Sequence, residues 1–358
     1  MDYGLKSLAP EAMPSCRMSP KWIVRAYVVI LPCLWWQEIS QAQAQAVAWQ
    51  VATVGLICAA MYWPLPRKWS SGTVGVLTGG LLVSSLFHWP TAGYPMVVLL
   101  VLIGWATVWG LIQLSPSAQW IEQSVVWLAL ANVGYALSQW AGYDPLFETQ
   151  RQMTGWMSRT NWLAVVWLVA LPLARRWQRV VLVGAIVWVH NWTAMLGMAG
   201  LGLVWAWHND LVKRRRLIDV GMAVVVGAVG WWVIHPSLWT MKIAPRLLTW
   251  QETFGQALWS PLWGYGLGAR SAMSKVGWGG DIGYNVWLEA FHAGGLLVLV
   301  PCVLIVRQLW RSATSPARTA LLVVAVAGCT QSLWNSTGLV IVTLALFAAW
   351  ELRRLDAV

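Results

Sequence analysis

Apolar segments of roughly the length that crosses a lipid bilayer recur along the chain, separated by short polar connections. The pattern predicts about twelve transmembrane helices. They lie near residues 21–37, 46–63, 72–89, 94–114, 120–140, 161–174, 177–190, 192–208, 217–235, 284–306, 318–334 and 337–351. We therefore expect an all-α, polytopic integral membrane protein in which residues 1–358 form a single transmembrane domain.

The composition agrees with this pattern and excludes an ordinary soluble domain. Of the 358 residues, 58% are hydrophobic and only 10% are charged. Many of the 31 Trp lie near the ends of predicted spans, where an amphipathic ring favours the membrane interface. The five Cys are scattered and follow neither a metal-binding nor a disulfide spacing.

The net charge of +11 is explained by membrane orientation rather than by nucleic-acid binding. Most cations lie in connections that follow an even number of predicted spans, and the positive-inside rule places these connections, with both termini, in the cytoplasm. The basic clusters lie at 17–21, 67–68, 175–179, 213–216, 307–318 and 353–354. The stretch 142–160 then becomes an external loop, and 236–283 becomes a large periplasmic loop.

Six cations do not follow this distribution, because they lie in the two external loops. An anionic ligand handled at the outer face would explain them. The alternative is that long loops translocate regardless of charge, and it is favoured for Lys242 and Lys275. The other four cations are Arg151, Arg159, Arg246 and Arg270.

Two residue pairs at helical spacing are candidates for chemistry. Glu289 and His292 are spaced i, i+3 at the start of a predicted span, where a carboxylate beside an imidazole suits acid–base chemistry at an outer cavity. Glu289 is expected to face that cavity, and His292 to extend the same wet face. A pair satisfied at the membrane interface is the alternative. Arg246 and Trp250 are spaced i, i+4, so the guanidinium shares a helix face with the indole and could bind a phosphate. A snorkelling interfacial arginine is the alternative there.

Common catalytic signatures do not occur in the sequence. There is no HExxH, no Walker A loop and no GxSxG. The stretch GYGLG at 264–268 resembles a nucleotide-binding loop only superficially, because no strand precedes it and no Rossmann helix follows. No metal or cofactor site is therefore expected.

Three blocks, in order, give the chain a recognisable likeness. They are RQMTGWMSRTNWLA (151–164), PRLLTWQETFGQALWSPLWGYGLGA (245–269) and YNVWLEAFHAGGLL (284–297). The blocks are similar to an Arg…Gly…Asn…Ala entry into a span, an Arg-x-x-x-Trp helix followed by Pro-x-x-Gly-x-Gly, and a His-Asn-x-x-Leu-Glu segment that ends at Gly. Over residues 145–310 the chain thus resembles the O-antigen ligase and O-antigen polymerase superfamily, which includes the pilin-type oligosaccharyltransferases.

The resemblance implies a GT-C-like, metal-independent glycosyltransferase of the bacterial inner membrane that needs no cofactor. Such an enzyme moves a glycan from undecaprenyl diphosphate to a lipid A–core, glycan or protein acceptor at the periplasmic face. The implied pyrophosphate-binding residues are Arg246, Arg151, Arg159 and Arg270. The implied catalytic residues are Glu289, His292 and Tyr284. Those implied to position the acceptor or the sugar are Trp250, Asn285, Asn161 and His190.

Two positions depart from the pattern of that family. Tyr284 stands where the family has His, although the expected Asn285 follows. Asn191-Trp192 stands where the family usually has Ser-Arg, so the second arginine is missing from its usual place. An arginine of the neighbouring loops would have to supply that charge.

Several functions remain open from the sequence. Ligase-type transfer is favoured because the external loops are modest, while polymerase and pilin-type oligosaccharyltransferase activities would use the same site. A transporter or flippase would instead have broken helices and charges near the bilayer midplane. A non-catalytic scaffold for polysaccharide assembly is a third possibility. The expected partners are the lipid-linked donor, its acceptor and membrane lipids, without nucleic acid.

Overall fold

The chain is α-helical wherever its elements are defined. The computed structural model describes residues 21–31, 42–62, 79, 83, 94–143, 160–189, 194, 197–198, 244–266, 285–312, 315–329 and 337–356. These ranges contain ten α-helices and no strand, which confirms the predicted all-α class. The helices are α1 (Lys21–Arg25), α3 (Ala42–Tyr62), α5 (Tyr94–Leu114), α6 (Ala118–Trp140), α7 (Thr160–Ala170), α8 (Arg176–Trp188), α12 (Ala244–Ala257), α13 (Val286–Arg311), α14 (Pro316–Ala327) and α15 (Thr337–Leu355). A π-helix, η1 (Ala26–Ile30), continues α1, and a 3-10 helix, η4 (Leu171–Leu173), continues α7.

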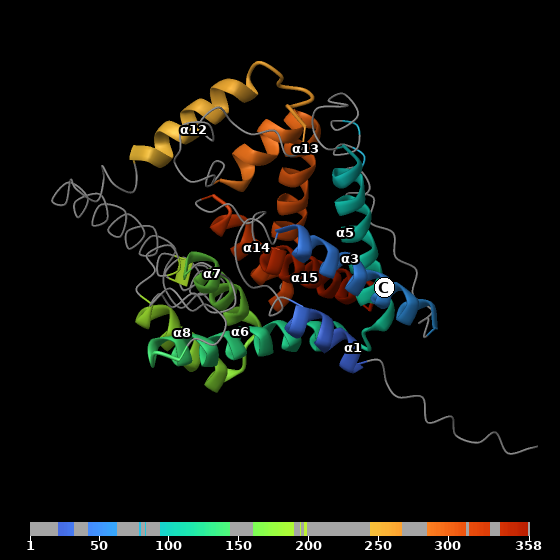
Figure 1. Cartoon of the computed structure of the whole chain (residues 1–358), viewed down its shortest axis with the longest axis vertical. Helices are drawn as coiled ribbons and strands as arrows, with labels where there is room; N and C mark the ends of the chain where they lie inside the picture. The colour runs from blue at the N-terminus through green and yellow to red at the C-terminus, as the bar shows by residue number, and fades with distance from the viewer. Residues whose placement is uncertain are drawn as a thin grey trace, which may run out of the picture.

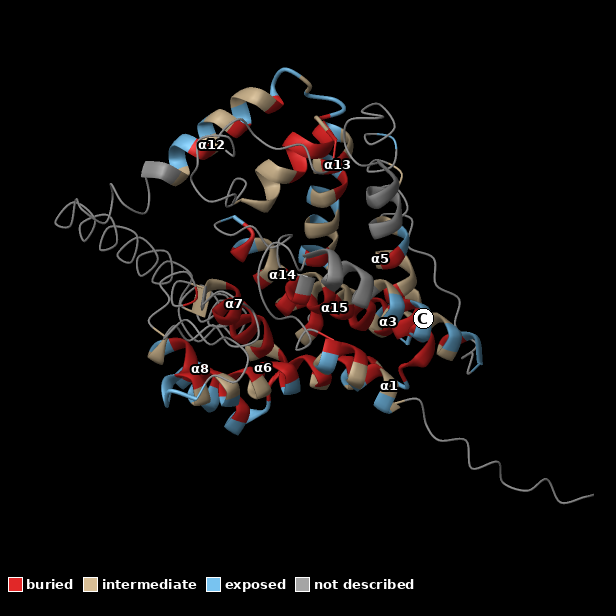
Figure 2. Cartoon of the chain, viewed as in Figure 1, coloured by how far each residue is buried: buried red, intermediate tan, exposed pale blue. Residues whose placement is uncertain are grey.

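Helix α15 lies at the centre of the packed helices and contacts α5, α6 and α14 (Figure 1). Helix α3 packs on α5, and α7 packs on α6, α8 and α14. The buried residues concentrate on α6, α7 and α15 (Figure 2). Leucine, valine and alanine dominate this core, as in the fully buried Leu128, Val166, Leu339 and Ala345. Small and branched side chains let neighbouring helices approach closely over a long contact.

A sharp corner separates α5 from α6. Pro116 lies in the three-residue break between them and has no N–H to continue the helical hydrogen bonds, and its ring disfavours a helical conformation at Ser115. Ser117 is extended (φ −160°, ψ 160°) and forms the N-cap of α6. The two helices consequently bend by 116°. They are two separate elements, as the sequence predicts for 94–114 and 120–140.

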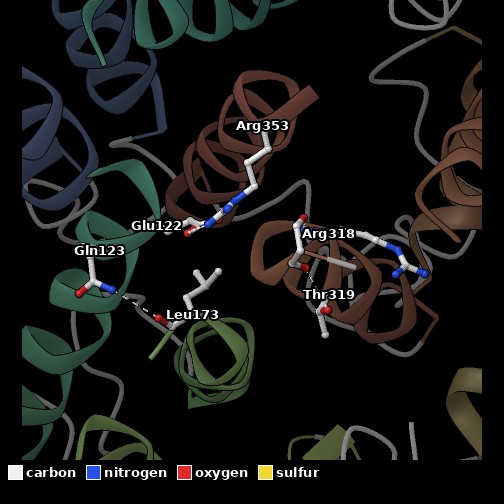
Figure 3. A network of polar contacts seen from close by, with 7 residues as sticks. Glu122, Gln123, Leu173, Arg318, Thr319 and Arg353 are labelled. Carbon is white, nitrogen blue, oxygen red and sulfur yellow. Dashed lines mark hydrogen bonds and ion pairs between the residues drawn. The ribbon is translucent and has the colours of Figure 1, made fainter. Parts of the chain in front are cut away.

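Polar contacts tie the ends of the helices together (Figure 3). Glu122, at the start of α6, is only 3% exposed and accepts two hydrogen bonds from the guanidinium of Arg353 in α15, at 2.7 and 2.8 Å. Arg318, near the start of α14, donates to the carbonyl oxygens of Leu309 and Trp310 at the end of α13. Each buried charge thus has partners, as a stable helical core requires.

The structure tests only some of the twelve predicted spans. Among the described residues one helix, α13, is long and apolar enough to cross a membrane, and the bent pair α5–α6 would be a second if it counted as one span. Shorter apolar helices cover residues 50–62, 161–173 and 316–327. Apart from single residues, the predicted spans at 72–89, 192–208 and 217–235 lie outside the described residues. The count of twelve therefore stays a prediction.

Candidate functional site

The second and third sequence blocks fold into one unit at one end of the molecule, built from α12, the turn 258–266 and α13 (Figure 1). Pro245 occupies the first turn of α12, where a missing N–H is tolerated. Helix α12 ends at Ala257, and the turn that follows carries Pro261, Gly264 and Gly266. Helix α12 packs against α13, and this contact includes the rings of Phe254 and Phe291, whose centroids are 6.1 Å apart.

Helix α13 is broken near its middle, at the point where the turn 258–266 meets it. Gly295 has φ 60° and ψ −152°, a conformation outside the helical region, so α13 consists of residues 286–294 and 296–311. Four backbone hydrogen bonds cross between the turn and the break, two in each direction. They run from Tyr265 N–H to His292 O (2.8 Å), Gly266 N–H to Ala293 O (2.8 Å), Leu296 N–H to Pro261 O (2.8 Å) and Leu297 N–H to Leu262 O (3.4 Å). The turn thereby satisfies carbonyl and N–H groups that a helix break leaves unpaired.

Two glycines make this backbone contact possible. A Cβ on Gly295 would lie 2.4 Å from the carbonyl carbon and oxygen of Leu262. A Cβ on Gly264, whose φ is +67°, would lie 2.5 Å from backbone atoms of Ala293 and Gly294. Both positions combine a left-handed φ with a contact against rigid backbone, so only glycine fits them without strain.

His292 is held by the same turn. Its ring stacks on that of Tyr265, with centroids 5.1 Å apart and planes 23° apart, and the residue is only 4% exposed. The expectation that His292 extends a wet face is therefore wrong. The Pro-Gly-rich turn covers the ring, because its backbone bonds to the carbonyl of His292 and its Tyr265 stacks on the imidazole.

Helix α12 presents the other half of the site. Arg246 and Trp250 are half-buried, and Thr253 is completely buried. These residues are spaced i, i+4 and i+7 and so share one side of the helix, as the sequence predicts for the first two. The indole Nε1 of Trp250 and the hydroxyl of Thr253 are buried and have no hydrogen-bond partner within the described part of the chain. Buried donors of this kind are uncommon in folded proteins and are candidates for ligand contacts.

Glu289 lies in the first turn of α13, where a carboxylate interacts favourably with the helix dipole. Asn285 is the N-cap of the same helix, and its side-chain oxygen accepts from the N–H groups of Trp287 and Leu288 at 2.9 and 3.1 Å. The amide of Asn285 donates to the carbonyl of Cys329, just after α14. Its polar atoms thus stabilise the start of α13, and any contact with an acceptor would be additional.

Only some of the predicted site residues lie together in the structure. The unit of α12, the turn and α13 contains Arg246, Trp250, Asn285, Glu289 and His292. Asn161 is the second residue of α7, which packs on α6, α8 and α14. The predictions for Arg151, Arg159, His190, Arg270 and Tyr284 lie outside the described residues.

The sequence interpretation missed three residues that shape this unit: Tyr265, Thr253 and Gly295. Tyr265 lies inside the Pro-x-x-Gly-x-Gly motif, and its role was hidden because its partner, His292, is distant in sequence. Gly295 had a visible signal, since a Gly-Gly pair inside an apolar helix often marks a break. Thr253 could have been found from its i, i+7 spacing to Arg246.

Among the described residues, no group of three or more His, Cys, Asp or Glu could hold a metal ion. No protein-family model matches the chain, and no curated protein matches it significantly.

Proposed function

We propose that the chain is a multispan glycosyltransferase of the bacterial inner membrane, of the O-antigen ligase type. It would move a glycan from an undecaprenyl-diphosphate carrier to an acceptor at the periplasmic face. The observation that carries the proposal is the packing of the helix with Arg246 and Trp250 against the helix with Glu289 and His292. The turn between them clamps the second helix by four backbone hydrogen bonds. The cation and the carboxylate that such a transfer needs thus belong to one packed unit.

The reaction needs two things from the protein: stabilisation of a leaving diphosphate and activation of a hydroxyl. The acceptor oxygen attacks the anomeric carbon of the sugar, and the bond from that carbon to the diphosphate oxygen breaks. The diphosphate leaves with the electron pair, and a base takes the proton of the hydroxyl. A guanidinium can form paired hydrogen bonds to the departing diphosphate, which stabilises the charge as it develops.

Within the unit, Arg246 is the proposed diphosphate-binding residue. Glu289 is the proposed base, because it is less buried than His292, although one of its carboxylate oxygens, Oε1, is buried. His292, stacked on Tyr265, would position the start of α13. The buried donors of Trp250 and Thr253 would contact sugar or phosphate oxygens. Arg151, Arg159 and Arg270 remain proposed as additional cations.

The proposed topology, with both termini in the cytoplasm, has separate support from the opposite part of the fold. Lys21 and Arg25, which precede or enter the first predicted span, lie 5.2 and 4.1 Å from the ring centre of Trp120. Arg353, after the last predicted span, pairs with Glu122, two residues beyond Trp120. The positive-inside rule assigns these three chain positions to the same side, and their contacts with one another are consistent with that assignment.

The decisive experiment replaces Arg246 and measures transfer from a purified undecaprenyl-diphosphate glycan to an acceptor. Loss of one group that stabilises transition-state charge lowers kcat/KM by about 10²–10³-fold, so Arg246→Ala should fall by that order. Arg246→Lys should recover only part of the rate, because an ammonium cannot make the paired hydrogen bonds.

The matched control is Arg179→Ala, which removes an exposed arginine of α8 outside this unit and should leave the rate unchanged. All variants are first checked for normal membrane insertion and thermal stability. Wild-type turnover in both Arg246 variants would remove this residue from the mechanism and with it the proposed site.

A transporter is the second candidate, because a span-length helix with a break, as in α13, is typical of transporters. In transporters the groups freed at a break bind substrate or ions, whereas in this chain four of them are bonded to the turn 258–266. Proteoliposomes loaded with an intact lipid-linked glycan separate the two functions. Vectorial movement of the glycan without any transfer would favour the transporter.

A further inference from the structure

The polarity of α12 is inverted relative to a helix on the surface of a soluble protein. The side that faces the protein carries Thr249 and Thr253 beside Ala257. The exposed side carries large apolar residues together with Gln251, and the exposed positions are the pale blue segments along α12 (Figure 2). A helix that packs on a soluble core has the opposite arrangement, with its apolar stripe inward.

The exposed apolar residues form one surface, which we call the outer apolar ridge. It consists of Leu247, Leu248, Phe254, Leu258, Trp259 and Leu262. The first three lie on the exposed side of α12, which also carries the exposed Gln251, and the last three extend the surface into the turn. Trp259 is 87% exposed, an unusual state for the largest apolar side chain.

The outer apolar ridge continues onto α13. The carbonyl of Leu262 accepts from the N–H of Leu297, so the end of the ridge lies against the second half of that helix. Exposed apolar residues then follow along this half: Leu296, Val300, Val303 and Leu304. A surface that covers the ridge would therefore also contact the exposed residues of α13, which among the described helices is the one long and apolar enough to cross a membrane.

We infer that the outer apolar ridge is seated in the outer leaflet of a lipid bilayer, so that α12 lies along the membrane interface. The two charged residues of α12, Arg246 and Glu252, lie off the exposed side that carries the ridge. A tryptophan at the rim of an apolar surface and charges beside it are the arrangement that an interfacial helix favours. The inference rests on the proposed membrane-spanning character of the chain and not on the transfer reaction.

This seating gives Arg246 a defined depth. A helix that is half-immersed along its length holds its flanking cation at the level of the lipid headgroups. The diphosphate of a polyprenyl-linked donor lies at that same level, because its prenyl chain is in the hydrocarbon region. The ridge would therefore set the height of the donor-binding cation relative to the bilayer, independently of the groups that act on the acceptor.

The test uses the full-length chain in nanodiscs of phosphatidylethanolamine and phosphatidylglycerol, with the five native cysteines replaced. A nitroxide is attached to Phe254→Cys or Leu258→Cys on the ridge, to Glu252→Cys as the same-helix control, and to Leu304→Cys on α13. Collision with oxygen, which concentrates in lipid, is compared with collision with a water-soluble nickel chelate. Thermal unfolding confirms that each labelled variant is folded.

The expected ratio of oxygen to nickel collisions is severalfold higher at Phe254 and Leu258 than at Glu252, and high at Leu304. If Leu304 is accessible to oxygen but both ridge positions are accessible to nickel, the ridge faces water and this inference is wrong, while the membrane proposal stands. If Leu304 is also accessible to nickel, the spanning character fails as well. Spin–spin broadening at the ridge that disappears on dilution with unlabelled protein would mean that a second copy covers it, which also overturns the inference.

Discussion

Replacement of Gly295 by alanine tests whether the break in α13 and the docking of the turn 258–266 hold the site together. An alanine here would have to keep a backbone conformation (φ 60°, ψ −152°) that is almost restricted to glycine, at a cost of about 1–3 kcal/mol. It would also lie 2.4 Å from the carbonyl of Leu262, and backbone cannot move aside as a side chain can. Overlap of this kind adds about 1–3 kcal/mol. The expected loss is therefore about 2–6 kcal/mol of unfolding free energy.

The chain has one way to avoid this strain, and it is also unfavourable. If α13 straightened through position 295, alanine would gain about 1 kcal/mol over glycine in helix propensity. The four backbone hydrogen bonds to the turn would then be lost, at about 0.5–1.5 kcal/mol each. Together the four bonds contribute about 2–6 kcal/mol, so their loss exceeds the gain over the whole of that range. Both routes therefore predict a less stable protein with the ring of Tyr265 displaced from His292.

The assay is unfolding of the purified protein in mixed detergent micelles as the fraction of SDS rises, followed by tryptophan fluorescence. The matched control is Gly255→Ala in α12, where a Cβ meets nothing within 4 Å and should stabilise the helix by about 0.5–1 kcal/mol. Transfer activity should fall in Gly295→Ala and persist in the control. A Gly295→Ala protein as stable as the wild type, beside a stabilised control, would refute the reasoning about the break.

Two further predictions concern buried polar groups. Glu122→Gln should lower the unfolding free energy by about 1–3 kcal/mol, because it leaves the half-exposed Arg353 without its anion. The double variant Glu122→Gln/Arg353→Gln should recover part of that loss. Additive effects in this double-mutant cycle, measured by the same unfolding assay, would show that the pair contributes nothing as a pair. Thr253→Val should raise stability by about 1 kcal/mol, since it removes a buried hydroxyl that has no partner among the described residues, yet it should slow transfer if that hydroxyl contacts the donor. In the control Thr343→Val the hydroxyl lost makes a 2.7 Å hydrogen bond to the carbonyl of Leu339, so this variant should be neutral or slightly destabilising. Full transfer activity in Thr253→Val would exclude Thr253 from the site.

The extent to which the sequence predicted this unit differs between its parts. The spacing of Arg246 and Trp250 implied that the two residues share one face if the segment is helical, and α12 supplies that helix. The spacing of Glu289 and His292 also predicted a helix correctly, but the depth of His292 was wrong. Burial of that ring depends on Tyr265, which approaches from a turn that precedes it by more than twenty residues. No periodicity within α13 carries information about such a partner.

By itself, the sequence determined the all-α class and, within a helical segment, the residues that share a helix face. These properties follow from local hydrophobic periodicity, which acts over a few turns of one segment. Only the tertiary structure decided that α13 breaks at Gly295, that the turn 258–266 fills the break, and that α12 turns its threonines inward and its leucines outward. The physical reason is that a glycine permits a left-handed conformation without requiring it. The conformation is adopted because another part of the backbone supplies the hydrogen bonds that the broken helix has lost.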